Sequence, residues 1–132
     1  MYNDVKILYQ NSCWVNCCYL SGYIAECYCK LLVNNAINSG LTTNHTTASR
    51  YGHNIVNLNN EIRNFTVNPN IASYLIDLNI DCSNIISEWD PKNMRYSENG
   101  CIWDDNRKAT NYYNEINIII QQFINMQVDG VI

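Results

Sequence analysis

The chain has 132 residues, of which 47% are hydrophobic and 15% are charged, and its formal net charge is −4. This length suggests a single domain with room for one hydrophobic core. General nucleic-acid binders usually present a basic face, because neutralisation of phosphate drives their binding. The eight Lys and Arg residues are spread along this chain and form no basic stripe, so nucleic acid would need a local basic pocket or a basic partner chain.

The N-terminal segment and the cysteines indicate a cytoplasmic protein. The start "MYNDVKILYQ" lacks the basic residues and apolar run of a secretory signal. The longest apolar stretch is interrupted by Glu26 and Lys30 and is a poor membrane span. The seven cysteines include no C-x-x-C pair and no Cys/His cluster at zinc spacing. We therefore expect buried free thiols, no metal, no cofactor and no association with a membrane.

Hydrophobic periodicity predicts about five helices and no strands. A short first helix is expected over residues 3–9, and a longer second helix over residues 13–35. Because the second helix is apolar on most of its sides, we place it in the middle of a bundle. The polar segment 38–52 predicts a long loop, with the alternative that His45 and Arg50 contact phosphate from a mobile lid.

The second half of the chain predicts two or three further helices. A third helix is expected over residues 53–65 and ends before Pro69, which cannot continue a helix. A fourth is expected from Pro69 or Asn70 to residue 86, with a break around residues 79–82, and the segment 88–105 is expected to be a loop. The last helix is expected over residues 104–126, capped by Asp104 or Asp105. The prediction is a single domain over residues 1–132, an all-α antiparallel up-and-down bundle of about four to five helices.

One carboxylate stands in the segment that the fold most needs to bury. Glu26 lies in "YLSGYIAECYCKLLV", four residues before Lys30, so that the two can pair on one helix face. An ionised carboxylate in an apolar surrounding needs a cation and hydrogen-bond donors, or it takes up a proton. We predict Arg95 as its partner, because Arg pairs with a carboxylate through two prongs, and His53 as a further donor. This pair either only fastens the fold or lines a functional pocket.

Three segments together resemble the HEPN (higher eukaryote and prokaryote nucleotide-binding) domain family. The family's second helix typically reads Tyr-Leu-Ala-Gly-Tyr-x-x-Glu-Cys-x-Leu-Lys, and "YGHNIVNL" and "WDPKNMRYS" are similar to two later family segments. The matching residues are Tyr19, Leu20, Gly22, Tyr23, Glu26, Cys27, Lys30, His53, Arg95 and Tyr96, whereas Asn54 replaces the usual Asp. The resemblance covers nearly the whole chain.

The resemblance implies a helical bundle that forms a homodimer and acts in a toxin–antitoxin, phage-defence or RNA-processing system. Such domains often occur beside a small nucleotidyltransferase, so a partner protein of that type is expected. Active members are metal-independent ribonucleases that carry Arg, four to six residues, and then His. That motif is missing here, because His45 has no preceding Arg and Arg50 precedes His53 by too few residues.

Three functions remain open at this point. The first is a non-catalytic module that dimerises and binds a partner protein or a nucleotide through Glu26, Lys30, His53, Arg95 and Tyr96. The second is a ribonuclease with a rearranged site built from His53, Arg95, Glu26 and Tyr96, in which Glu26 orients the imidazole. The third is a plain structural partner, such as the antitoxin-bound half of a pair whose catalytic chain is elsewhere. Two roles are also open for the aromatic residues of the predicted loop. They either stack bases or seal the loop over the bundle, and they are Trp89, Trp103 and Tyr96.

Overall fold

The computed structural model describes residues 1–38, 52–64, 72–97 and 100–131. This part of the chain contains seven helices and no strand, which confirms the prediction of an all-α fold. The helices are α1 Tyr2–Gln10, α2 Trp14–Asn38, α3 Ile55–Asn64, α5 Leu78–Asp81, α6 Ser83–Glu88, α7 Pro91–Met94 and α8 Asn106–Val128. The predicted polar loop with His45 and Arg50, and the predicted stop at Pro69, lie outside the described residues.

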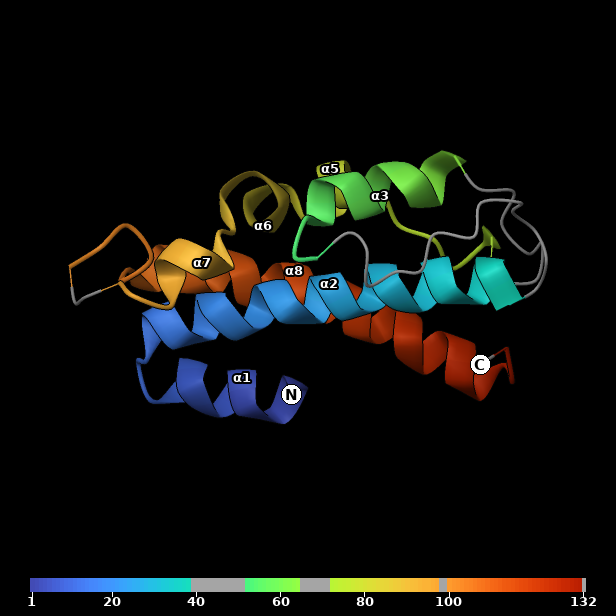
Figure 1. Ribbon diagram of the computed structural model, residues 1–132. Coiled ribbons are helices and arrows are strands. Elements are labelled where there is room, and N and C mark those ends of the chain that lie inside the picture. The colour runs from blue at the N-terminus through green and yellow to red at the C-terminus, as the bar shows by residue number, and fades with distance from the viewer. Residues whose placement is uncertain (39–51, 65–71, 98–99, 132) are drawn as a thin grey trace.

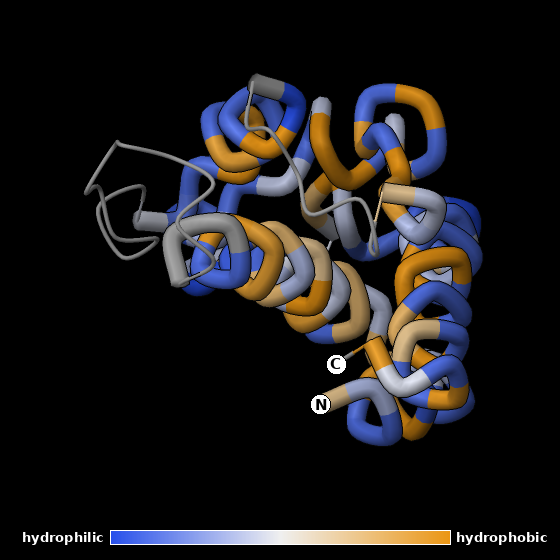
Figure 2. The backbone as a smooth tube through the Cα atoms, turned by 90° about the vertical axis from the view of Figure 1, so that its right-hand side faces the viewer, coloured by the Kyte–Doolittle hydropathy of each residue, from blue (hydrophilic) through white to orange (hydrophobic). Residues whose placement is uncertain are grey.

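The longest helix, α2, is the centre of the bundle, as its all-round hydrophobicity predicts. In Figure 1, α1 lies on one side of α2, α3 and α6 lie on the opposite side, and α8 runs along its length. Figure 2 shows α2 as a largely hydrophobic segment between helices that alternate between hydrophilic and hydrophobic residues. The side chains of Cys17, Ala25, Cys29 and Val33 are fully buried. Small thiols and Ala at these positions allow the neighbouring helices to approach α2 closely.

The predicted fourth helix is wrong in its extent, because side chains satisfy the backbone where the helix was expected to continue. Residues 75–77 are not helical, and the amide of Ile76 donates to the hydroxyl of the buried Tyr28 at 3.1 Å. The carboxylate of Asp77 then accepts from the amide of Asn79 and caps α5. A second interruption at Cys82 separates α5 from α6, close to the break expected around residues 79–82.

The segment predicted as a loop before the last helix contains one helical turn, α7. Asp90 caps this turn by accepting from the amide of Asn93, and Pro91 occupies the first helical position, where a missing N–H costs nothing. Asp105 caps α8 by accepting from the amide of Arg107, which confirms one of the two predicted caps. These local bonds place α7 beside α2, the helix that carries the predicted site residues Glu26 and Lys30.

The first helix is attached to the last one by aromatic side chains. The ring of Tyr113 stacks on Tyr9 with 4.8 Å between centroids and on Tyr2 with 6.3 Å. The hydroxyl of Tyr2 donates to the side chain of Asn117 at 2.5 Å, and the hydroxyls of Tyr9 and Thr110 share a bond of 2.8 Å. α1 therefore closes the bundle over both α2 and α8.

The seven cysteines are all free and differ in exposure. Four are buried, Cys101 is intermediate, and Cys13 and Cys27 are exposed, so the prediction of buried thiols holds for only part of the set. Within the described ranges, no helix is both long enough and apolar enough to cross a membrane.

Candidate functional site

The carboxylate of Glu26 is buried on the side of α2 that faces α3, where it has two partners. Lys30 Nζ lies 2.5 Å from one carboxylate oxygen, and His53 Nδ1 lies 2.9 Å from the other. The side chain of Glu26 is 6% exposed, compared with 27% for Lys30 and 53% for His53. Both predicted alternatives to Arg95 are thus in contact with the carboxylate. An ionised carboxylate only accepts hydrogen bonds, so Nδ1 of His53 is the donor and the lone pair of the neutral ring is on Nε2.

The predicted pair between Glu26 and Arg95 is wrong. Arg95 follows α7 and is exposed, and the nearby hydroxyls of Tyr19 and Tyr23 raise the pKa of its guanidinium above the ordinary value. Tyr19 and Tyr23 lie one helical turn apart on α2 and share a hydrogen bond of 3.3 Å between their hydroxyls, and no ion pair of the described residues joins Arg95 to Glu26. Two closer donors already satisfy the carboxylate, and the guanidinium stays at the surface.

Four aromatic side chains form a cluster around Tyr23, which we call the Tyr23 cluster: Tyr19, Tyr23, His53 and Trp89. Tyr23 meets each of the other three rings edge to face, at centroid distances of 5.1 Å for Tyr19, 5.4 Å for His53 and 5.0 Å for Trp89. Such arrangements place the positive ring edge on the negative ring face. The cluster therefore joins α2 to the start of α3 and to the end of α6.

The two tyrosine hydroxyls are unequal. The bond from Tyr23, followed by the contact with Arg95, lowers the pKa of Tyr19. Burial, followed by the bond to Tyr19, raises the pKa of Tyr23. Tyr19 is thus the more acidic hydroxyl of the pair.

Trp89 seals the bundle, whereas Tyr96 does not. The indole of Trp89 is only 8% exposed, and its Nε1 donates to the backbone oxygen of Tyr19 at 3.1 Å. Trp103 is buried to the same extent. Tyr96 is 78% exposed and remains at the surface beside Arg95. A sealing role therefore accounts for both tryptophans, and only Tyr96 offers an open aromatic face.

An open cleft of about 590 Å³ lies next to the Tyr23 cluster. Its walls are residues 53–56 at the start of α3 and residues 86–92, which run from α6 into α7. Of the predicted site residues, only His53 lines it. The other four lie outside its walls: Glu26 and Lys30 on α2, and Arg95 and Tyr96 after α7.

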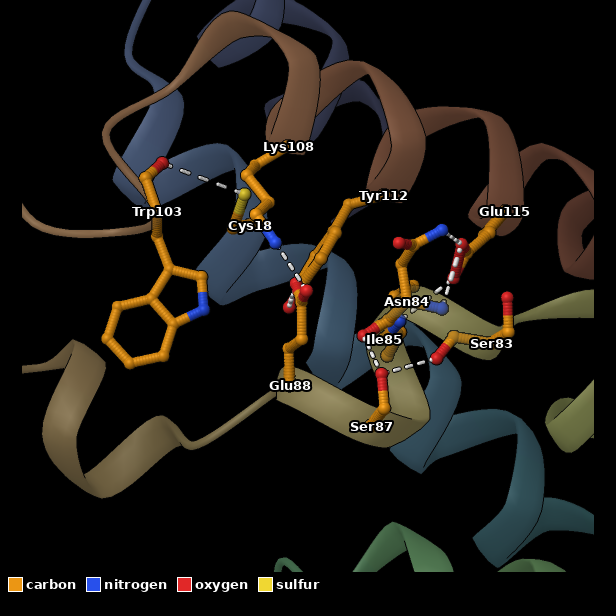
Figure 3. Close-up of polar contacts among 10 residues, drawn as sticks. All are labelled: Cys18, Ser83, Asn84, Ile85, Ser87, Glu88, Trp103, Lys108, Tyr112 and Glu115. Carbon is orange, nitrogen blue, oxygen red and sulfur yellow. Dashed lines mark hydrogen bonds and ion pairs between the residues drawn. The ribbon is translucent and has the colours of Figure 1, made fainter.

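The wall formed by α6 is held to α8 by two carboxylates (Figure 3). Glu88 forms an ion pair with Lys108 and accepts from the hydroxyl of Tyr112 at 3.3 Å. The buried Glu115 accepts from the amide of Ile85 at 2.9 Å and from both the amide and the side chain of Asn84. Burial raises the pKa of the Tyr112 hydroxyl, which keeps it protonated as a donor. This wall of the cleft is therefore a rigid part of the bundle.

The arrangement has some elements of acid–base chemistry. The carboxylate of Glu26 holds the imidazole of His53 in one orientation, as in an oriented general base. The guanidinium that would stabilise a phosphate contacts Tyr23 from the hydroxyl side, rather than lying beside His53. Among the described residues, no group of three His, Cys, Asp or Glu side chains could hold a metal ion.

The sequence reasoning missed the residues that connect the site. Tyr19 and Tyr23 were named as matches to the family's second helix, and their proximity to Arg95 was not foreseen. Gly22 was the available signal, since a Gly in the middle of a long apolar helix often marks a close approach by another group. Comparison with known proteins identified no relative: no family model, no curated protein and no solved structure matches the chain.

Proposed function

We propose that the chain is a HEPN-like helical module that pairs with a second copy and binds a partner protein or a nucleotide. It would act in the cytoplasm, in a toxin–antitoxin, defence or RNA-processing system, beside a partner such as a nucleotidyltransferase. The observation that carries the proposal is the outer face of α2, the side turned away from the core. The residues of this face follow helical spacing and are Asn16, Leu20, Cys27, Leu31 and Asn34.

The outer face of α2 has the chemistry of a self-association surface. All five of its side chains are neutral, although the whole chain carries a net charge of −4. Leu31 is 40% exposed and Cys27 is exposed, so apolar and thiol surface faces water. Two copies that meet through this face bring no like charges together at the contact. A two-fold axis near its middle would set Cys27 close to the same residue of the second copy.

Sedimentation and cross-linking test the pairing. We expect a dimer for the native chain and a monomer for Leu31→Glu, because a carboxylate would be buried in the interface. Ile80→Glu is the matched control, since Ile80 is 76% exposed on α5, away from α2. A short bis-maleimide should link native chains, and Cys27→Ser should lose the link. A native chain that sediments as a monomer at tens of micromolar would refute the pairing.

A second function, a ribonuclease with a rearranged site, is supported by the bond between Glu26 and His53. In this mechanism the imidazole removes the proton of a 2′-hydroxyl, whose oxygen attacks phosphorus while the 5′-oxygen leaves. Arg95 and Tyr96 would contact the phosphate from the far side of Tyr23.

An RNA-cleavage assay decides between the two functions. Single-stranded RNA is incubated with the native chain, His53→Ala and Arg95→Ala. Cleavage by the native chain alone would establish the ribonuclease. Absence of cleavage by all three leaves the binding module.

A further inference from the structure

We propose that the cleft between α3 and the α6–α7 segment binds an extended peptide of a partner protein that carries an aliphatic side chain next to a carboxylate. This inference rests on the proposed function, since it names the site at which the module would hold its protein partner. It assigns a role to residues 53–56 and 86–92, of which the resemblance singles out only His53 and Asn54.

The shape of the cleft suits a chain segment. Its volume of about 590 Å³ lies within the range of small-ligand sites, but the cleft is open along its length rather than enclosed. Its apolar wall includes Val56, which is 46% exposed, together with the half-buried Ile86 and the ring of Pro91. These groups offer contact for one aliphatic side chain while the rest of the segment passes through.

The lining also argues against a nucleotide base as the main occupant. Bases bind to exposed aromatic faces, and the only large aromatic residue in the lining is Trp89. Its indole is 8% exposed, with Tyr23 against it and the backbone of Gly22 beneath it. An aliphatic anchor therefore fits this wall better than a stacked ring.

The charges around the cleft favour an acidic ligand. Lys92 is exposed and takes part in none of the ion pairs formed by described residues. Glu88 is neutralised by Lys108, and the carboxylate of Asp90 accepts from the amide and side chain of Asn93. Lys92 thus remains as the donor available to a ligand carboxylate.

Selection from a displayed library of random heptapeptides, followed by fluorescence anisotropy, tests the inference. We expect the native chain to enrich peptides with Leu, Ile or Val next to Asp or Glu. A synthetic copy of the enriched peptide should bind Lys92→Glu about tenfold more weakly, because one charge-assisted bond is lost. Val56→Asp should weaken binding similarly by placing a charge on the apolar wall, and Ile80→Glu, outside the cleft, should not change it. Circular dichroism checks that each variant is folded.

Amide shift mapping with the same peptide locates the contact. Shifts confined to residues 53–56 and 86–92 would support the site. Enrichment of peptides without the acidic and aliphatic pair would overturn it, as would binding by Lys92→Glu and Val56→Asp that is as tight as binding by the native chain. Failure of the proposed dimer is measured separately by sedimentation of Leu31→Glu, a residue that does not line the cleft.

Discussion

The indole of Trp89 lies directly against the backbone of Gly22, in the space that a side chain at residue 22 would occupy. A β-carbon placed on Gly22 would come within 2.0 Å of the indole, so no other residue fits without a shift. This approach brings the end of α6 onto α2 and forms one side of the Tyr23 cluster. The glycine in the centre of the most hydrophobic helix is therefore explained by packing.

Gly22→Ala should destabilise the protein strongly. The added methyl group has to displace a buried ring, which costs about 1–3 kcal/mol of unfolding free energy even though Ala favours helix. Urea denaturation measures the loss, with Asn16→Ala on the exposed face of the same helix as the control. In a Trp89→Leu background the same Gly22→Ala change should cost less, and an unchanged cost would show that the indole is not the obstacle.

Removal of both partners of Glu26 should cost more than the sum of the single losses. Lys30→Met or His53→Ala alone leaves one donor on the carboxylate, and each should reduce the unfolding free energy by about 1 kcal/mol. The double variant leaves a buried carboxylate without a cation, for which a loss of about 3–5 kcal/mol is expected. Chemical denaturation of the four proteins gives the coupling energy. Additive losses would mean that Glu26 reaches water.

Glu115→Ala should weaken the attachment of α6 to α8. The substitution leaves the amides of Asn84 and Ile85 without an acceptor in a buried setting, at a cost of about 2–4 kcal/mol. Glu115→Gln keeps the shape and one acceptor oxygen, so its loss should be smaller. Asn114→Ala, at the adjacent exposed position of α8, is the control in the same denaturation experiment. Equal stabilities for Glu115→Ala and Asn114→Ala would contradict the capping role.

The stabilising effect of the Asp77 charge should disappear in acid. The bond from Asn59, followed by that from the amide of Asn79, lowers the pKa of Asp77 below its ordinary value of 3.8. A carboxyl group with a lowered folded pKa stabilises the fold above its unfolded pKa and loses this effect as pH falls through the folded value. The stability difference between the native chain and Asp77→Asn should therefore be full above about pH 5 and shrink below pH 4. Thermal melts across this range measure it, and a pH-independent difference would contradict the assignment.

Thiol alkylation should separate the cysteines by burial. Burial raises the pKa of Cys17 to about 11 and that of Cys29 to about 12, so both are protonated and inaccessible in the folded protein. A maleimide at neutral pH should modify the exposed Cys13 and Cys27 first. The buried thiols should react only in denaturant. Peptide mass mapping reads the order, and rapid modification of Cys29 in the folded chain would refute the placement of α2 at the centre.

Local signals in the sequence were sufficient for the long helices. The all-round hydrophobicity of α2 predicted its central place, and Asp105 predicted the start of α8 to within two residues. The short helices were harder to predict, because their ends depend on bonds between distant residues. The hydroxyl of Tyr28 accepts a hydrogen bond from the amide of Ile76, and the carboxylate of Glu115 accepts from amides at the start of α6. The hydrophobic pattern of residues 69–86 cannot reveal these bonds, because their acceptors lie on other helices.

The candidate site was predicted in its members but not in their pairing. The burial of Glu26 and its contact with His53 follow from charge and position, and both are present. The choice of Arg95 over Lys30 relied on the geometry of an ideal two-pronged pair. In the folded chain Lys30 and His53 satisfy the carboxylate, and Arg95 lies near Tyr19 and Tyr23 instead. This arrangement depends on how the helices are placed in space.

The stacking of α1 on α8 affects the order in which the chain folds during its synthesis. Tyr2 bonds a residue 115 positions later, and Tyr9 bonds one 101 positions later. The chain is synthesised from its N-terminus. The residues of α8 that contact α1 are therefore made only after nearly all of the remaining chain. Docking of α1 is accordingly a late step of folding. An experiment that follows the chain during synthesis should find its first helix accessible until its last helix has emerged.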